Sequence, residues 1–232
     1  MEENAVTTWK VIARIRSDFP AKFGIPRQSN VVKSLRSSIV FEAEYRSPDA
    51  LRGLESFSHI WLIWEFSEAK KESWSPTVRP PRLGGNTRVG VLASRSPYRP
   101  NPVGLSSVKI ESIEDHPELG KVIHILGADL MDGTPIFDIK PYIPFADCHP
   151  EALGGFAAEP PTGKLQVIMD ARTADLLPAD LHASLKEVLA QDPRPSYHHD
   201  PERIYGMSFG GFEIRFSVAE DNLTVVDIIK AV

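Results

Sequence analysis

The chain has 232 residues, of which 42% are hydrophobic and 25% are charged. This composition is typical of a globular protein with one large domain, or one domain and a small companion, and it excludes disordered and fibrous classes. The single cysteine, Cys148, excludes an internal disulfide and a cysteine-based structural zinc site. No apolar run approaches the roughly 20 residues that span a bilayer, and the acidic N-terminus is unlike a signal peptide. We therefore expect a cytoplasmic protein with no membrane partner.

The net charge of −5 is unevenly distributed along the chain. Residues 1–110 carry 17 lysines and arginines against 10 aspartates and glutamates, a net of +7, whereas residues 111–232 carry 9 against 21, a net of −12. Residues 73–110 contain no acidic residue, and most of their cations are arginines, whose guanidinium groups match phosphate and carboxylate geometry. The cations of this stretch are Arg79, Arg82, Arg88, Arg95, Arg99 and Lys109. The stretch indicates either an anionic partner or a solvated basic face.

Short runs rich in β-branched and aromatic residues recur through the first two-thirds of the chain, separated by segments rich in glycine, proline and serine. The predicted strands are residues 8–16, 39–45, 59–66, 88–93, 103–113 and 121–126. Because no long helical pattern separates them, we predict a mainly β fold, an antiparallel barrel or sandwich, rather than a doubly wound sheet. Residues 67–87 form a long connection that we expect to be an ordered excursion.

The pattern changes near residue 146. A linker-like composition is followed by a strand-like run over 164–172, a helical pattern over 175–190 and a hairpin with its turn at 220–222. We therefore expect a mainly β domain, an antiparallel barrel or sandwich, over residues 1–146, a linker over 147–163 and a small α+β C-terminal domain over 164–232.

The densest motif is SRSPYRPNPVGLS at residues 94–106. Its three prolines restrict the backbone, and Gly104 permits close approach. Its recognition side chains are Arg95, Tyr98, Arg99 and Asn101. Because a rigid loop loses little entropy when it binds a ligand, we favour a binding loop over a simple proline-rich turn.

A second motif is DLMDGTPIFDIKPYIP at residues 129–144. Asp138, Lys140 and Tyr142 recur at every second position, which places them on one side of an extended segment. They could act together on a substrate, although an Asp–Lys pair on a sheet surface gives the same pattern and is slightly favoured on the residues alone.

Two loop motifs are less specific. PRQ at 26–28 suits an anionic or purine-like group but is weak by itself, and DPRPSY at 192–197 fits a helix-stopping loop as well as an RNA contact. The sequence has no glycine-rich nucleotide signature and no metal-ligand spacing, so we expect no metal.

Six segments together resemble the TsaA-like, or TrmO, family of bacterial tRNA methyltransferases. They are PRQ at 26–28, RGLESFSHIWLI at 52–63, WSPTVRPPRLGGN at 74–86, SRSPYRPNPVGLS at 94–106, DLMDGTPIFDIKPYIPFAD at 129–147 and DPRPSY at 192–197. The resemblance covers essentially the whole chain. It implies a homodimeric β-barrel enzyme that binds S-adenosylmethionine and often carries a small C-terminal domain. It also implies methylation of the exocyclic amine of threonylcarbamoyladenosine, just 3′ of the anticodon in threonine tRNAs.

The resemblance implies cofactor contacts at eleven positions. They are Pro26, Arg27, Gln28, Ser67, Glu68, Arg95, Leu105, Asp129, Leu130, Met131 and Asp132. Around Ser67 and Glu68 similar proteins often carry a histidine, so this chain departs from the family pattern there. A backbone contact would survive that change, whereas a side-chain contact need not.

The acceptor amine is a weak nucleophile, because its lone pair is delocalised into the purine and the carbamoyl group. Positioning is expected to supply much of the rate enhancement, and a base could add on the order of 10²–10⁴-fold. We expect Asp138 to be that base, with Asp132 as the competing candidate. Lys140 and Tyr142 would then orient the threonyl carboxylate or the edge of the nucleobase.

The remaining expected contacts are with the tRNA, through its anticodon arm. Phosphate contacts are expected from Arg79, Arg82, Arg88 and Arg99, a further substrate contact from Asn101, and contacts to the anticodon arm from Arg194 and Tyr197. We expect no DNA partner. A non-catalytic RNA- or nucleotide-binding barrel is the alternative, and it would bind RNA without the cofactor. A metal-dependent hydrolase has only scattered histidines and aspartates to support it.

Overall fold

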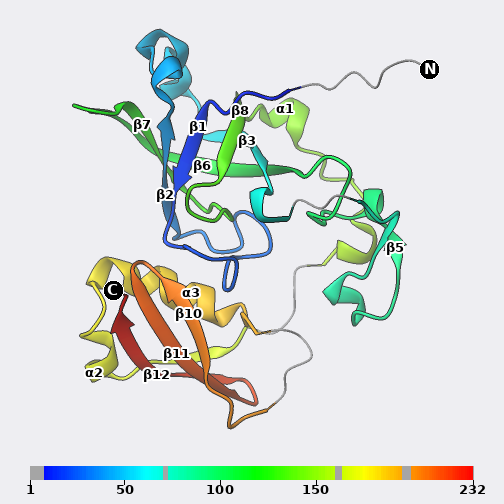
Figure 1. The fold of residues 1–232 in the computed structure, drawn as a ribbon, viewed down its shortest axis with the longest axis vertical. Helices are drawn as coiled ribbons and strands as arrows, with labels where there is room; N and C mark the ends of the chain where they lie inside the picture. The colour runs from blue at the N-terminus through cyan, green and yellow to red at the C-terminus, as the bar shows by residue number, and fades with distance from the viewer. Residues whose placement is uncertain (1–7, 70–72, 160–163, 195–199, 232) are drawn as a thin grey trace.

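The structure is a computed structural model that describes residues 8–69, 73–159, 164–194 and 200–231. Its larger sheet has antiparallel strands in the order β1, β2, β7, β6, β3, β8, and it closes into a barrel because β1 also pairs with β8 (Figure 1). These strands are β1 (Ala13–Arg16), β2 (Arg36–Phe41), β3 (His59–Glu65), β6 (Val103–His116), β7 (Gly120–Leu126) and β8 (Pro135–Pro141). The predicted mainly β, antiparallel class is therefore confirmed.

The barrel interior is filled by every second residue of its strands. In β3, Ile60, Leu62 and Trp64 are buried, while the residues between them are partly exposed. Successive strand side chains point to opposite faces, so these three face the interior. They pack there with Ile15, Ile39, Val108, Ile123, Ile125 and Ile136.

One predicted strand, residues 88–93, is wrong. Only Val89–Gly90 (β5) is extended, and it pairs with Thr77–Val78 (β4) in a separate two-stranded sheet. Val91–Ala93 forms a 3-10 helix (η6) in which Val91 is buried. The apolar residues that predicted a strand therefore belong to a helical turn packed against the protein. The sixth barrel strand is β8 instead. The end of predicted strand 39–45 is also wrong, because Ala43–Tyr45 forms a 3-10 helix (η1).

The smaller sheet has the order β10, β11, β12, β9, and only β9 runs parallel to its neighbour. Its strands are β9 (Gln166–Ile168), β10 (Tyr205–Phe209), β11 (Phe212–Ala219) and β12 (Asn222–Lys230). The predicted hairpin is confirmed in β11 and β12, with Glu220 of the turn at a φ of 51°.

Helices are short throughout the described residues. The α-helices are α1 (Pro144–Asp147), α2 (Ala171–Ala174) and α3 (His182–Ala190). The other 3-10 helices are η2 (Pro48–Leu51), η3 (Leu54–Ser56), η4 (Ser67–Ala69), η5 (Pro81–Leu83), η7 (Gly155–Ala157) and η8 (Ala179–Leu181). The helix predicted over 175–190 begins only at His182, because Pro178 lacks a backbone N–H and interrupts the hydrogen-bond pattern. None of the helices in the described part of the chain has the length and apolarity needed to cross a membrane.

Residues 17–35, which connect β1 to β2, lie between the barrel and the smaller sheet (Figure 1). Phe19, Val32 and Leu35 of this connection are buried in the same hydrophobic cluster as the residues of β10, β11, β12 and α3. The connection thus belongs to the C-terminal core, although the chain enters and leaves it through barrel strands.

Candidate functional site

The candidate site lies at one end of the barrel. Because neighbouring barrel strands are antiparallel, the ends of β1, β3 and β7 meet the beginnings of β2, β6 and β8 at that end. A cavity of about 1980 Å³ opens among the connections there, including residues 25–28, 64–69, 75–81 and 94–105. Small-molecule pockets are usually about 300–1,000 Å³, so this cavity has room for a cofactor and a second ligand.

Nine of the eleven predicted cofactor positions line this cavity. They are Pro26, Arg27, Gln28, Ser67, Glu68, Arg95, Leu105, Asp129 and Met131. The other two have different surroundings. Leu130 is buried in the barrel core, and the Asp132 carboxylate accepts a hydrogen bond of 3.0 Å from the backbone N–H of Ser17. The segments that carry the nine positions are far apart in sequence, and the barrel brings them together.

Direct hydrogen bonds join three of these segments. The guanidinium of Arg95 donates to the side-chain oxygen of Gln28. Lys22 Nζ donates to the backbone oxygen of Glu68 over 2.6 Å. The connection 17–35 is therefore tied to Glu68 and Arg95, and through Ser17 it is also tied to Asp132.

A polar relay inside the barrel mouth holds the Asp129 carboxylate. Ser106 Oγ donates to Asp129 Oδ1 over 2.6 Å and accepts from Trp64 Nε1 over 3.0 Å. Gly104 makes room for the indole, since a Cβ atom at this glycine would lie 2.3 Å from the ring. Sequence reasoning missed Trp64 and Ser106, although strand alternation places both on the inner face.

Burial raises the pKa of Asp129 above its ordinary value of 3.8. The hydrogen bond from Ser106 and the positive charge of Arg95 act in the opposite direction, because both stabilise the ionised carboxylate. A negative charge enclosed in this way is more stable when a cation is bound beside it. The cavity wall thus suits a ligand that carries a positive charge.

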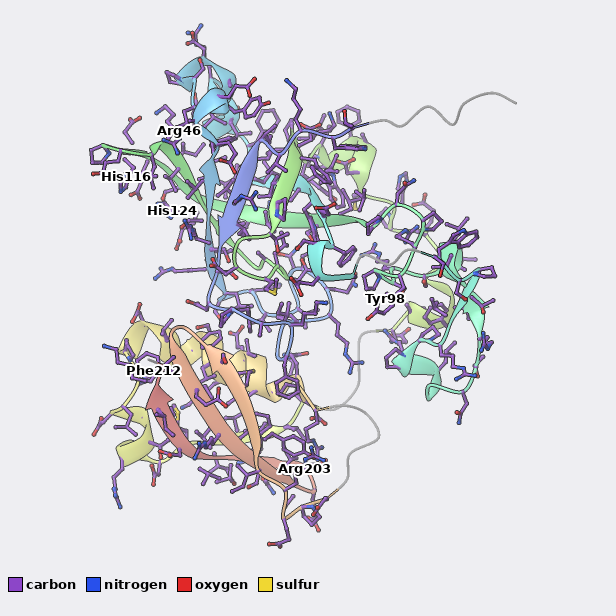
Figure 2. All side chains as sticks on the ribbon, viewed as in Figure 1. Arg46, Tyr98, His116, His124, Arg203 and Phe212 are labelled. Carbon is purple, nitrogen blue, oxygen red and sulfur yellow. The ribbon has the colours of Figure 1, made fainter. Side chains whose placement is uncertain are left out.

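Arginines dominate the charged part of the lining. Arg79, Arg88, Arg95 and Arg99 line the cavity, whereas the guanidinium of Arg82 donates to the backbone oxygen of Glu159 outside it. The predicted substrate residue Asn101 also lines the cavity, as does Tyr98. Figure 2 shows Tyr98 between the barrel and the segment that carries β5. This rim combines positive charge with an exposed ring.

Asp138, Lys140 and Tyr142 do not line this cavity. Asp138 and Lys140 form an ion pair of 3.0 Å, which is the alternative that the sequence left open. Tyr142 packs against Trp61, with ring centroids 5.7 Å apart. Since β8 begins at the cavity end of the barrel and leads away from it at about 3.3 Å per residue, Tyr142 lies towards the opposite end.

The predicted anticodon contacts lie in the C-terminal part. Arg194 donates from Nε and Nη2 to both carboxylate oxygens of Asp192, at 2.8 and 2.9 Å, and its side chain is only 12% exposed. The hydrogen bonding to Asp192 raises the pKa of Arg194. Tyr197 falls outside the described residues. A role for either residue in reading RNA stays a prediction.

Replacing Asp129 tests whether its buried negative charge destabilises the ligand-free protein. Because its folded-state pKa is raised, the wild type loses stability as the pH rises from about 3.8 through that raised pKa. Asp129→Asn should therefore be more stable than the wild type at neutral pH without ligand, with a gain that shrinks towards pH 4. Denaturant unfolding between pH 4 and 8 measures this, with the exposed Asp115→Asn as a control that shows no gain. A gain independent of pH would contradict the prediction.

Comparison with known proteins assigns the chain to a family. The family model of the tRNA-methyltransferase O N-terminal domain matches residues 14–148, and that of the TrmO C-terminal domain matches residues 164–231. A protein of Escherichia coli strain K12 named tRNA (adenine(37)-N6)-methyltransferase is 42% identical over 223 residues, which cover 92% of this chain and 94% of that protein. A Pseudomonas aeruginosa protein whose name describes an S-adenosylmethionine-dependent methyltransferase is 37% identical, over 94% of this chain and 95% of its own length. The crystal structure of TrmO from P. aeruginosa superposes with a TM-score of 0.80 at 31% identity and covers all of both chains. The chain belongs to the TrmO family.

Proposed function

We propose that this protein transfers a methyl group from S-adenosylmethionine to the exocyclic amino nitrogen of threonylcarbamoyladenosine, next to the anticodon of threonine tRNAs. The observation that carries the proposal is that nine predicted cofactor residues line one cavity in a chain 42% identical to a tRNA (adenine(37)-N6)-methyltransferase. A tRNA substrate is consistent with a cytoplasmic location.

The cavity fits S-adenosylmethionine on chemical grounds. The cofactor carries a sulfonium cation, which suits the enclosed carboxylate of Asp129, and a carboxylate, which suits the guanidinium groups of Arg27 and Arg95. The exposed apolar side chain of Leu105 can pack against a purine. When bound, the cofactor supplies an activated methyl group. The residues of the chain contribute by holding both ligands in line and by excluding water.

We also propose the division of labour among the parts of the chain. The barrel, residues 1–146, would hold the cofactor and the reacting nucleotide, a linker would span 147–163, and residues 164–232 would contact the anticodon arm through Arg194 and Tyr197. The separate matches of two family models, to residues 14–148 and 164–231, support this division.

The arginines of the cavity rim would hold tRNA phosphates. Arg79, Arg88 and Arg99 line the cavity, and Arg82 lies on the same segment, which contains no acidic residue. Arg79→Ala should weaken tRNA binding and reduce the slope of log affinity against log salt by about one. Arg52→Ala, an exposed arginine paired with Asp49 at the other end of the barrel, should leave the slope unchanged. Equal slopes for Arg79→Ala and the wild type would remove these contacts from the proposal.

We further propose that the enzyme is a homodimer in which Asp138 of one copy serves as the base at the cavity of the other. Within one chain Asp138 does not line the cavity, so a second copy is needed to bring it there. Exposed apolar side chains support self-association, because Phe145 and Leu153 are 90% and 98% exposed.

Asp138→Asn should then lower turnover about 10²-fold or more with unchanged cofactor affinity, because only the proton acceptor is lost. Mixing it 1:1 with Arg95→Ala should restore about a quarter of the wild-type activity, since half of the dimers then hold one intact site. Near-normal turnover of Asp138→Asn excludes it as the base, and Asp132→Asn is then compared. No recovery in the mixture contradicts the shared site.

The whole proposal is tested by methyl transfer. Purified protein is incubated with S-adenosylmethionine labelled on the methyl group and with threonine tRNA that carries or lacks the threonylcarbamoyl group. We expect label to enter only the modified tRNA, and thermal shifts should show stabilisation by the cofactor alone. Transfer to neither tRNA overturns the proposal, and RNA binding without cofactor binding would indicate the non-catalytic module.

A further inference from the structure

The connection 17–35 has two faces with different partners. On its barrel side it carries the predicted cofactor residues Pro26, Arg27 and Gln28, which line the cavity. On its other side it packs into the core of the C-terminal sheet. Ile25 joins the two, because it lines the cavity and also packs against the C-terminal core. The connection is thus a layer between cofactor cavity and C-terminal sheet.

On the barrel side, polar contacts hold the connection. Lys22 donates to the backbone of Glu68, and Gln28 accepts from Arg95. Asn30, at a φ of 62°, donates from its backbone N–H to Gly127 O over 2.9 Å and from its side chain to Ser107 O over 2.9 Å. These contacts fix where the connection lies along the barrel, but they leave its outer side uncovered.

On the outer side, strand β10 and its following turn cover the connection. Phe19 meets Phe209 edge to face, with ring centroids 5.3 Å apart, and Asp18 O accepts a hydrogen bond of 2.8 Å from Gly210 N–H. Met207 lies against Gly24, at a φ of 93°, where an added Cβ atom would come within 2.0 Å of the methionine sulfur. β10 is an edge strand of its sheet, and the turn that follows it meets the connection at Asp18.

We propose that β10 of the C-terminal sheet is part of the cofactor site, and that Met207 is a positioning residue for the cofactor loop, residues 25–28. The inference rests on the proposed function, since it concerns the same cavity. Without its own strands, the connection must be ordered by its neighbours, because fixing each residue in one conformation costs backbone entropy. Packing against Met207 and Phe209 fixes the conformation of the connection in the cofactor-free protein. Cofactor binding then does not bear the full ordering cost.

This arrangement separates binding from chemistry. Met207 lies behind the loop and does not line the cavity, so it acts on the cofactor only through Gly24 and the residues that follow. Loosening its packing should therefore weaken cofactor affinity and leave the rate at saturating cofactor nearly intact. The C-terminal sheet would serve the cofactor as well as the tRNA.

The test compares three variants of the full chain by isothermal titration with S-adenosylmethionine. Met207→Ala removes the packing beneath Gly24 and should raise the dissociation constant about tenfold, with kcat unchanged at saturating cofactor. Met207→Leu keeps the side-chain volume and should retain wild-type affinity. Leu223→Ala removes a fully buried side chain of the same core. Leu223 lies on β12, beyond the first residue of β10 and away from the end of β10 that meets the connection, so this variant should destabilise the fold without changing affinity. Circular dichroism confirms that each variant is folded, and Met207→Val replaces Met207→Ala if the latter does not fold.

The proposal is supported if Met207→Ala binds S-adenosylmethionine more weakly than the wild type while Met207→Leu and Leu223→Ala bind it as tightly as the wild type. Unchanged binding by Met207→Ala, or equal weakening by Leu223→Ala, overturns it, because the effect would then be absent or one of general stability. A wild type that binds no cofactor overturns the proposed function itself and is seen before any variant is compared.

Discussion

The closure of the barrel is the constraint on which the rest of the structure depends. β1 has only four residues, yet it pairs on one side with β2 and on the other with β8. A closed ring of antiparallel strands has two ends, and each connection must lie at one of them. The connections between β1 and β2 and between β7 and β8, together with the segments that follow β3 and precede β6, all meet at the same end. The site is a direct consequence of that topology.

The electrostatics of this end differ from those of the whole chain. The net charge is −5, but the cavity rim carries the arginines of an acid-free stretch, and the buried carboxylate of Asp129 stands behind them. Positive charge at the rim suits a polyanion, whereas the carboxylate suits a cation deeper in the cavity. The two ligands of a methyl transfer from S-adenosylmethionine to tRNA have these opposite charges. An acidic remainder limits general affinity for nucleic acid.

The connection 17–35 shows how the two hydrophobic cores are linked. Its apolar residues belong to the C-terminal core, while its polar residues and the predicted cofactor residues face the cavity at the end of the barrel. Neither core would hold it alone, because each covers only one face. A change in packing near β10 therefore alters the part of the connection that lines the cavity. By the reciprocity of coupled equilibria, a ligand bound in the cavity also stabilises the sheet near β10.

The sequence by itself determined the local features of this protein. Strand alternation, proline-rich loops, the arginine stretch and the family strings were sufficient for the mainly β class, the β11–β12 hairpin and nine positions that line the cavity, because such signals lie within a few neighbouring residues. The tertiary structure decided what depends on distant residues. Val91 resembles a strand residue but fills a turn, and Leu130 of the cofactor motif is turned into the barrel core. The period-two pattern predicted that Asp138 and Lys140 lie on one side of an extended segment, and their ion pair agrees with this. Only barrel closure decided that this side lies outside the cavity. The relay from Trp64 through Ser106 to Asp129 joins three separate segments, and no local pattern records which strands become neighbours.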